Sequence, residues 1–128
     1  TQQGKQDEAM AAFRQAIKFD PHDGRAYAQL ALLLANTGRA DESFSVYRDG
    51  ARNVPRDGDL QEGYAYALMF RKDYRGAAEA YRQAALYKGS TPTINQGFQS
   101  ALKFVAYEEQ LAKQKAALEA KQKKKQKK

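Results

Sequence analysis

Cysteine is absent from the 128-residue chain, and histidine occurs once, at position 22. Without cysteine the chain has no disulfide framework, no thiolate nucleophile and no cysteine-ligated metal site. No apolar run approaches the 18 residues that a membrane-spanning helix requires, and no signal-peptide pattern is visible. The sequence therefore excludes a disulfide scaffold and a transmembrane helix, and it assigns no compartment.

The positive charge is concentrated at one end of the chain. The formal net charge at pH 7 is +7, yet residues 121–128, KQKKKQKK, hold six lysines and no acid. Subtracting these six charges from +7 leaves only +1 for residues 1–120. We interpret the tail as a disordered, solvated end, with anionic lipid or nucleic acid as alternative partners. Its lysines are Lys121, Lys123, Lys124, Lys125, Lys127 and Lys128.

Similar segments recur 34 residues apart. Residues 59–68 read DLQEGYAYAL, and residues 93–102 read TINQGFQSAL. An earlier pair reads GKQDEAMAAFRQAIKFDP at 4–21 and GRADESFSVYRDGARNVP at 38–55. A fixed period of this length indicates a repeat architecture, in which each unit buries its apolar face against the next.

The apolar spacing within each unit is helical. Ala9, Phe13 and Ile17 follow one another at intervals of four residues, as on one face of a helix. Turn-forming residues such as Gly38 and Pro55 separate the apolar stripes. The pattern predicts no strands, and it predicts helices over residues 5–19, 24–36, 40–53, 58–70 and 74–87, with a long helix from about residue 92.

The repeated residues resemble the tetratricopeptide repeat (TPR), whose 34-residue unit has aromatic and small residues at fixed positions. The second unit matches at Tyr27, Leu30, Ala31, Gly38, Tyr47 and Pro55. The third matches at Tyr64, Ala65, Tyr74, Ala77, Tyr81 and Ala84, with Gln61 where an aromatic is common. The first supplies only its second helix, through Gly4, Ala9, Phe13, Ala16 and Pro21. The resemblance covers residue 4 to about residue 104, and it implies an all-α, right-handed α-solenoid of helix-turn-helix pairs.

The resemblance also implies how the chain is organised. A TPR array is expected over residues 1–91, as a half repeat at 1–23 and full repeats at 24–57 and 58–91. The fourth unit begins in the same way, but the turn that should follow has no Gly or Pro. Residues 92–120 are therefore expected to form an extended C-terminal helix that first caps the solenoid and then projects from it.

The first helix lacks the partner helix with which a repeat of this kind begins. The apolar side chains of Ala9 and Phe13 would then have no cover on one flank. We expect the chain to be a fragment of a longer array, or another subunit to cover this flank. Alternatively, the helix packs adequately on residues 24–36 and leaves one flank wet.

Enzyme chemistry finds little support in the sequence. His22 lies in a PHDG segment with only Asp20 and Asp23 nearby, so we interpret it as a solvated loop residue. Glu108 and Glu109 are adjacent on a predicted helix, so they face different sides and cannot act as a pair. The sequence therefore predicts no enzyme, no catalytic or metal site and no cofactor.

The resemblance implies a concave groove, lined by the first helix of each pair, that holds peptides or partner helices. The residues expected to contact a partner there are Arg25, Leu32, Asn36, Tyr66, Met69 and Phe70. Alternatively, the apolar members pack on the C-terminal helix or on further repeats. Family members that clamp a peptide carboxylate use Lys, Asn and Arg at positions held here by Ala28, Leu32 and Gly63, so the resemblance does not imply that activity.

The sequence as a whole favours a protein–protein interaction module or scaffold whose partner is a protein or peptide. The alternatives are an electrostatic anchor to RNA or an anionic membrane through the lysine tail, and self-association through the open end of the solenoid. Gly63 and Gly97 each lie inside a predicted helix, where glycine costs about 1 kcal/mol relative to alanine. We expect close approach of the preceding helix at both positions.

Overall fold

The computed structural model describes residues 1–127, which fold into helices without any strand. The helices are α1 (Gln2–Phe19), α2 (Gly24–Asn36), α3 (Ala40–Asn53), α4 (Gly58–Phe70), α5 (Tyr74–Lys88) and α6 (Pro92–Gln126). The predicted all-α class is confirmed. The bounds of α1 to α5 agree with the predicted ranges to within three residues.

Capping residues set where the helices begin. Asp23, Asp57 and Asp73 each precede a helix, and each carboxylate accepts a hydrogen bond from the backbone N–H three residues later. Thr91 caps α6 in the same way, and Pro92 occupies the first turn, where its missing N–H costs nothing. These side chains satisfy backbone groups that a helix leaves unpaired at its start.

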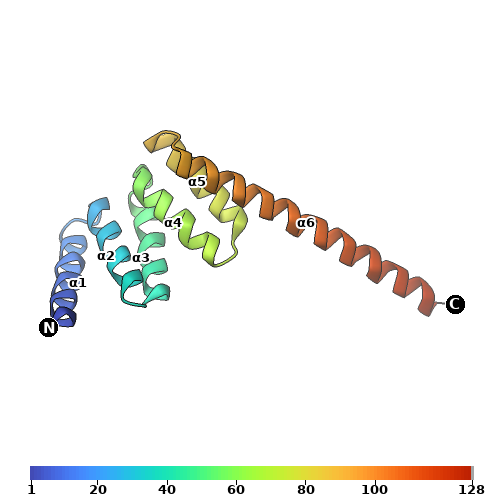
Figure 1. The fold of residues 1–128 in the computed structure, drawn as a ribbon, viewed down its shortest axis with the longest axis horizontal. Helices are drawn as coiled ribbons and strands as arrows, with labels where there is room; N and C mark the ends of the chain where they lie inside the picture. The colour runs from blue at the N-terminus through green and yellow to red at the C-terminus, as the bar shows by residue number, and fades with distance from the viewer. Residues whose placement is uncertain (128) are drawn as a thin grey trace.

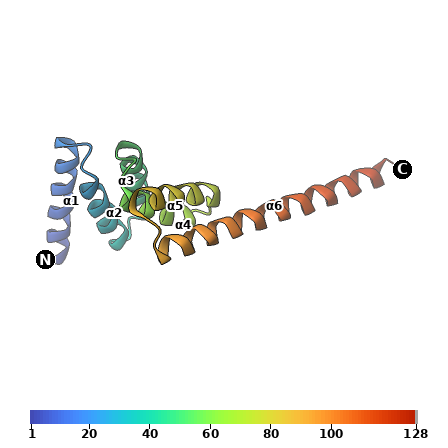
Figure 2. The ribbon, with the colours of Figure 1, turned by 90° about the horizontal axis from the view of Figure 1, so that it is seen from above.

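The helices stack in chain order. Figure 1 shows α1 to α5 side by side, with α6 running past α5 and far beyond the other helices, so that the termini lie at opposite ends. The turned view in Figure 2 shows the same rod leaving the stack. Each helix packs mainly on the helices before and after it. This nearest-neighbour packing is the organisation of a solenoid.

Three buried clusters follow one another along the stack. The first joins α1 to α2 and contains Met10, Leu30 and Leu34. The second joins α2, α3 and α4 and contains Tyr27, Ala31, Tyr47 and Leu60. The third joins α4, α5 and α6 and contains Ala65, Leu68, Ala77, Ala78, Ala80, Tyr81, Ala84, Ile94 and Ala101. Because successive clusters share helices, each helix pair is stabilised by its neighbours.

Met10 anchors α1 to the rest of the solenoid. Its side chain is fully buried in the first cluster, although the helical spacing in the sequence did not single it out. Ala9 and Phe13 are half-buried, and Phe13 packs against the same cluster. Within this chain, the helix packs on residues 24–36.

α6 has a packed half and a free half. Ile94 and Ala101 are buried in the third cluster, and the ring of Phe104 stacks on Tyr74 of α5 with centroids 4.7 Å apart. From Ala106 to Lys127 every residue is exposed. The first half therefore closes the end of the solenoid, and the second half projects from it (Figure 1).

The lysine tail differs from its interpretation as disordered. The sequence predicts a disordered end over residues 121–128, but α6 continues through Gln126. Lysine and glutamine are good helix formers, and lysines near a helix C-terminus interact favourably with its dipole. Lys128 lies outside the described residues. With 35 residues α6 is roughly 52 Å long. Within residues 1–127, no helix combines the length and the apolar character needed to cross a bilayer.

Candidate functional site

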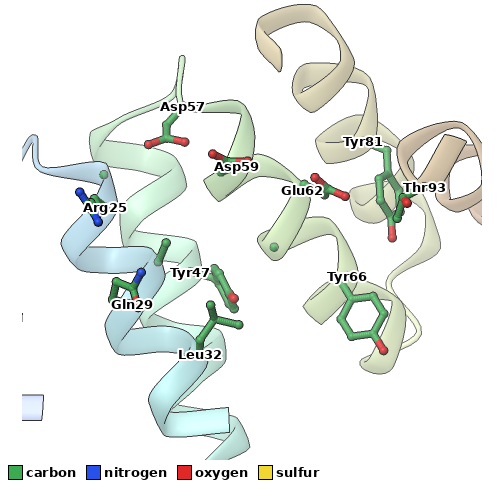
Figure 3. A pocket seen from close by; sticks show the side chains of 13 residues that line it. Arg25, Gln29, Leu32, Tyr47, Asp57, Asp59, Glu62, Tyr66, Tyr81 and Thr93 are labelled. Carbon is green, nitrogen blue, oxygen red and sulfur yellow. The ribbon is translucent and has the colours of Figure 1, made fainter. Parts of the chain in front are cut away.

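Two hollows lie on the face that α2 and α4 share. Their volumes are about 680 Å³ and 530 Å³, and we refer to them as the first and second hollow. They adjoin, because Leu32, Tyr47, Gly63 and Tyr66 line both. Figure 3 shows α2 on one side of the first hollow, α4 on the other and Tyr47 of α3 between them. Together the hollows form one continuous surface, named here the α2–α4 groove.

Most of the residues expected to contact a partner lie along this groove. Arg25 lines the first hollow, whereas Asn36 and Phe70 line the second. Leu32 and Tyr66 line both hollows, so they occupy the middle of the groove.

Met69 is the exception among the expected groove residues. It lines neither hollow, and its half-buried side chain packs against the third cluster. Adjacent residues of an α-helix are rotated by about 100°, so the step from Phe70 to Met69 turns the side chain out of the groove. We therefore leave Met69 out of the candidate site.

The middle of the groove is apolar and uncovered. The side chains of Leu32, Tyr66 and Phe70 are 49%, 62% and 74% exposed. The rings of Tyr66 and Phe70 meet edge to face, with centroids 5.1 Å apart. None of these three side chains packs against the third cluster, which includes residues of α6.

The floor of the groove is formed by two tyrosines that belong to second helices of pairs. Tyr47, on α3, lines both hollows, and burial raises the pKa of its phenol. Tyr81, on α5, lines the first hollow, and its pKa is raised by burial and then by the nearby Glu62 and Tyr66. Both phenols are therefore neutral at physiological pH, and the floor adds no charge to the groove.

The carboxylates at the first hollow outnumber the cations near them by one. Its acidic residues are Asp57, Asp59 and Glu62. Lys88 of α5 donates to Asp59 at 2.7 Å and to Glu62 at 2.9 Å, and these bonds raise the pKa of Lys88 well above its usual range. Asp57 accepts the cap bond from Leu60 N–H at 3.1 Å. The carboxylates thus have partners within the protein, and Arg25 is the cation that lines this hollow.

The second hollow has one compensated ion pair at its edge. Arg71 donates to Asp41 at 2.8 Å, and its guanidinium lies 3.9 Å from the centre of the Phe44 ring. Both contacts use the same cation, so little positive charge is left for a ligand. The groove as a whole offers an apolar centre between an end with one excess negative charge and an end whose ion pair is neutral.

The other residues considered in the sequence lie away from the groove. His22 is exposed in the loop before α2, with Nδ1 4.0 Å from Asp20. Lys121, Lys123, Lys124, Lys125 and Lys127 lie at the far end of α6. Within residues 1–127, no three side chains of metal-ligating types gather in one place.

The sequence prediction missed Tyr47 as a groove residue, because it assigned the groove to the first helix of each pair, and it missed Arg71, which directly follows the last residue of α4. Tyr47 reaches the groove floor from α3, and Gly63 beside it has no side chain to cover the ring. The recurrence of a glycine 16 residues after an aromatic, as in Tyr47 with Gly63 and Tyr81 with Gly97, was the available signal.

Comparison with known proteins identifies the repeat. A family model described as TPR repeat matches residues 1–38. The small glutamine-rich tetratricopeptide repeat-containing protein 2 of Mycosarcoma maydis is 35% identical over 65 residues, which cover 51% of this chain and 18% of that protein. The chain therefore spans about a fifth of the length of this curated relative.

Several solved structures share the fold. The first TPR of Spaghetti (RPAP3), bound to the HSP90 peptide SRMEEVD, matches with a TM-score of 0.68, 13% identity and coverage of 82% of this chain and 83% of that chain. The TPR2B domain of yeast Sti1 in its pHsp70 complex matches with a TM-score of 0.63 and 22% identity, over 80% of this chain and 86% of that chain. The TPR domain of P58(IPK) matches with a TM-score of 0.63 and 14% identity, over 84% of this chain and 31% of that chain. These likenesses, together with the helix pairs, confirm an α-solenoid.

Proposed function

The chain belongs to the tetratricopeptide repeat family, and we propose that its α2–α4 groove binds an apolar segment of a partner protein. The segment is a peptide or one face of a helix, laid along the groove. The chain then works as a non-enzymatic interaction module or scaffold. Its chemistry is confined to non-covalent recognition.

One observation carries this proposal: three large apolar side chains, Leu32, Tyr66 and Phe70, remain exposed along two joined hollows. Apolar surface that gathers in a groove is typical of interaction sites, and aromatic residues often dominate their binding energy. The groove stands on packed helices, so a partner orders little of the receptor when it binds.

Two of the structural neighbours support a peptide as the ligand class. They were solved with the HSP90 peptide SRMEEVD and with pHsp70. The charges here favour a less acidic ligand, because Lys88 and Arg71 are already paired with carboxylates of the protein. We therefore expect apolar anchors, rather than carboxylates, to supply most of the affinity.

A selection of displayed random peptides on the full chain tests the proposal. We expect the selected peptides to be rich in Leu, Phe and Met, and to bind by fluorescence anisotropy with little dependence on salt. The double variant Leu32→Ser/Phe70→Ser should weaken them by about ten-fold or more, since each lost apolar contact is worth about 1 kcal/mol or more. Both side chains are exposed, so the fold should persist by circular dichroism.

Two controls separate groove binding from other surfaces. Leu86 is exposed on α5 outside both hollows, so Leu86→Ser should bind the selected peptides like the unaltered chain. Deletion of residues 119–128 should also leave their binding unchanged. If Leu86→Ser lost as much peptide affinity as Leu32→Ser/Phe70→Ser, or if the tail deletion lost peptide affinity, the groove would be ruled out as the binding site. Dimerisation that Leu32→Ser/Phe70→Ser abolishes would instead identify a second copy as the occupant and reject the proposal.

A further inference from the structure

The free half of α6 carries a second apolar stripe, separate from the face that caps the solenoid. Its members Tyr107, Leu111 and Leu118 are roughly half exposed or more. Successive members are four and seven residues apart, so their side chains share one face of the helix. The capping face is different, because Ile94 and Ala101 point into the third cluster. The stripe thus remains uncovered in the folded chain.

The same half of α6 is strongly basic. Residues 107–127 hold seven lysines, all of them within 113–127, and three acids, Glu108, Glu109 and Glu119, which gives a formal charge of +4. Lys115 lies between Leu111 and Leu118 along the helix, four residues after the first and three before the second, so it flanks the stripe. An exposed apolar stripe flanked by lysines is the pattern of a helix that lies on a membrane surface.

We propose that residues 107–127 of α6 bind the surface of a bilayer that contains anionic lipids. The helix lies in the plane of the interface, with Leu111 and Leu118 at the acyl boundary. The lysine stems extend along that boundary while their ammonium groups reach the headgroups. Figures 1 and 2 show this half of α6 leaving the other helices, so a flat surface can meet it without first unfolding the solenoid.

Charge and shape favour a bilayer over two other occupants. A second copy of α6 would bring two segments of charge +4 together, and their repulsion opposes a helix pair. Nucleic acid would neutralise the lysines, but it offers no apolar surface against which the leucine stripe could be buried. An anionic bilayer accommodates both features, since it offers negative headgroups above an apolar layer.

Flotation of the full chain with vesicles tests the proposal. We expect binding to vesicles of phosphatidylcholine mixed with phosphatidylserine, and none to phosphatidylcholine alone. Replacing Lys121, Lys123, Lys124 and Lys125 by Gln should weaken binding by about 600-fold, since each of the four lysines contributes about five-fold near an anionic surface. Leu111→Ser/Leu118→Ser should weaken it by about ten-fold or more, through lost apolar burial.

A matched variant controls for helix propensity. Ala116→Ser/Ala117→Ser introduces the same two serines in the same segment but outside the stripe, so it should bind vesicles like the unaltered chain. Absence of binding to the phosphatidylserine vesicles would overturn the proposal. Unchanged binding by the leucine variant would overturn it too, because attraction of the lysines alone would then suffice.

The remaining outcomes distinguish the other occupants. Polyuridylic acid that displaces the chain from vesicles, with equal affinity for the leucine variant, would point to nucleic acid and overturn the proposal. A dimer that light scattering detects and that Leu111→Ser/Leu118→Ser abolishes would show that a second copy covers the stripe. That outcome would also overturn the proposal. A monomer that binds only anionic vesicles through both features is the expected result.

Discussion

The phenol ring of Tyr47, on α3, rests against the backbone of Gly63, on α4. A β-carbon at position 63 would meet three ring carbons of Tyr47, two of them at 2.8 and 3.0 Å. The contact recurs one repeat later, where the ring of Tyr81 lies against Gly97. The expectation that both glycines mark close approach of the preceding helix is confirmed. In the first pair, this approach also opens the floor of the groove.

Gly63→Ala should therefore destabilise the fold. Overpacking a core costs about 1–3 kcal/mol, whereas alanine gains about 1 kcal/mol over glycine in a helix. We expect a net loss of about 1 kcal/mol in the free energy of unfolding, measured by urea denaturation.

Gly4→Ala is the matched control for this substitution. Gly4 also lies in a helix, but its β-carbon would meet only the Thr1 hydroxyl oxygen, at an ordinary 3.4 Å. This variant should be as stable as the unaltered chain or slightly more stable. Equal stabilisation by both substitutions would show that the ring of Tyr47 yields freely, against our account.

The helices could be predicted because local signals and the 34-residue period agree. Breakers such as Gly38 and Pro55 separate the stripes, and each stripe reappears in register in the next unit. What could not be predicted depends on small rotations about a helix axis. Met69 and Phe70 are neighbours in sequence, yet one packs on the third cluster and the other lines the groove.

The hydrogen bonds between repeats also exceed what the sequence pattern reveals. Gln61 stands where the repeat usually has an aromatic, and its amide donates to the carbonyl of Pro55 at 3.1 Å. One repeat earlier, the hydroxyl of Tyr27 donates to the carbonyl of Pro21 at the same distance. Two different side chains thus make the same bond, which a comparison of residue types does not anticipate.

Tyr27→Phe tests the importance of this bond. The Tyr27 hydroxyl also accepts a hydrogen bond from the Asn53 amide at 2.8 Å, so its removal breaks two bonds in a partly buried site. At about 0.5–1.5 kcal/mol for each bond, the free energy of unfolding should fall by about 1–3 kcal/mol. If the two side chains are linked by this bond, Asn53→Ala should lower the free energy of unfolding less in the Tyr27→Phe background than in the unaltered chain. Strict additivity would contradict the linkage.

Alkaline pH should destabilise the solenoid through the buried tyrosines. Burial raises the pKa of Tyr47 and Tyr81 in the folded state, so the folded chain holds these protons more tightly than the unfolded chain does. The stabilisation is complete below the unfolded pKa, about 10, and is lost as the pH rises through the folded pKa values. Tyr47→Phe should therefore show a smaller decrease in melting temperature above about pH 10.

Tyr107→Phe provides the comparison for the alkaline experiment. Tyr107 is exposed on the free half of α6, so removing its hydroxyl should leave the pH dependence of the melting temperature unchanged. A Tyr47→Phe profile that coincides with that of Tyr107→Phe would show that burial of the Tyr47 phenol does not govern alkaline stability.

The two halves of α6 should differ in their contribution to stability. Among the described residues, deletion of residues 112–128 removes only exposed side chains, and it keeps the ion pair between Glu109 and Arg75. We expect the free energy of unfolding to change by less than about 0.5 kcal/mol. Deletion from Ala101 onward removes that fully buried residue, uncovers the third cluster and takes away the ring stacked on Tyr74. It should cost about 3 kcal/mol or more, measured by urea denaturation. Because both deletions shorten the same helix, a similar cost for the two would mean that α6 stabilises the solenoid through its length and not through the cap.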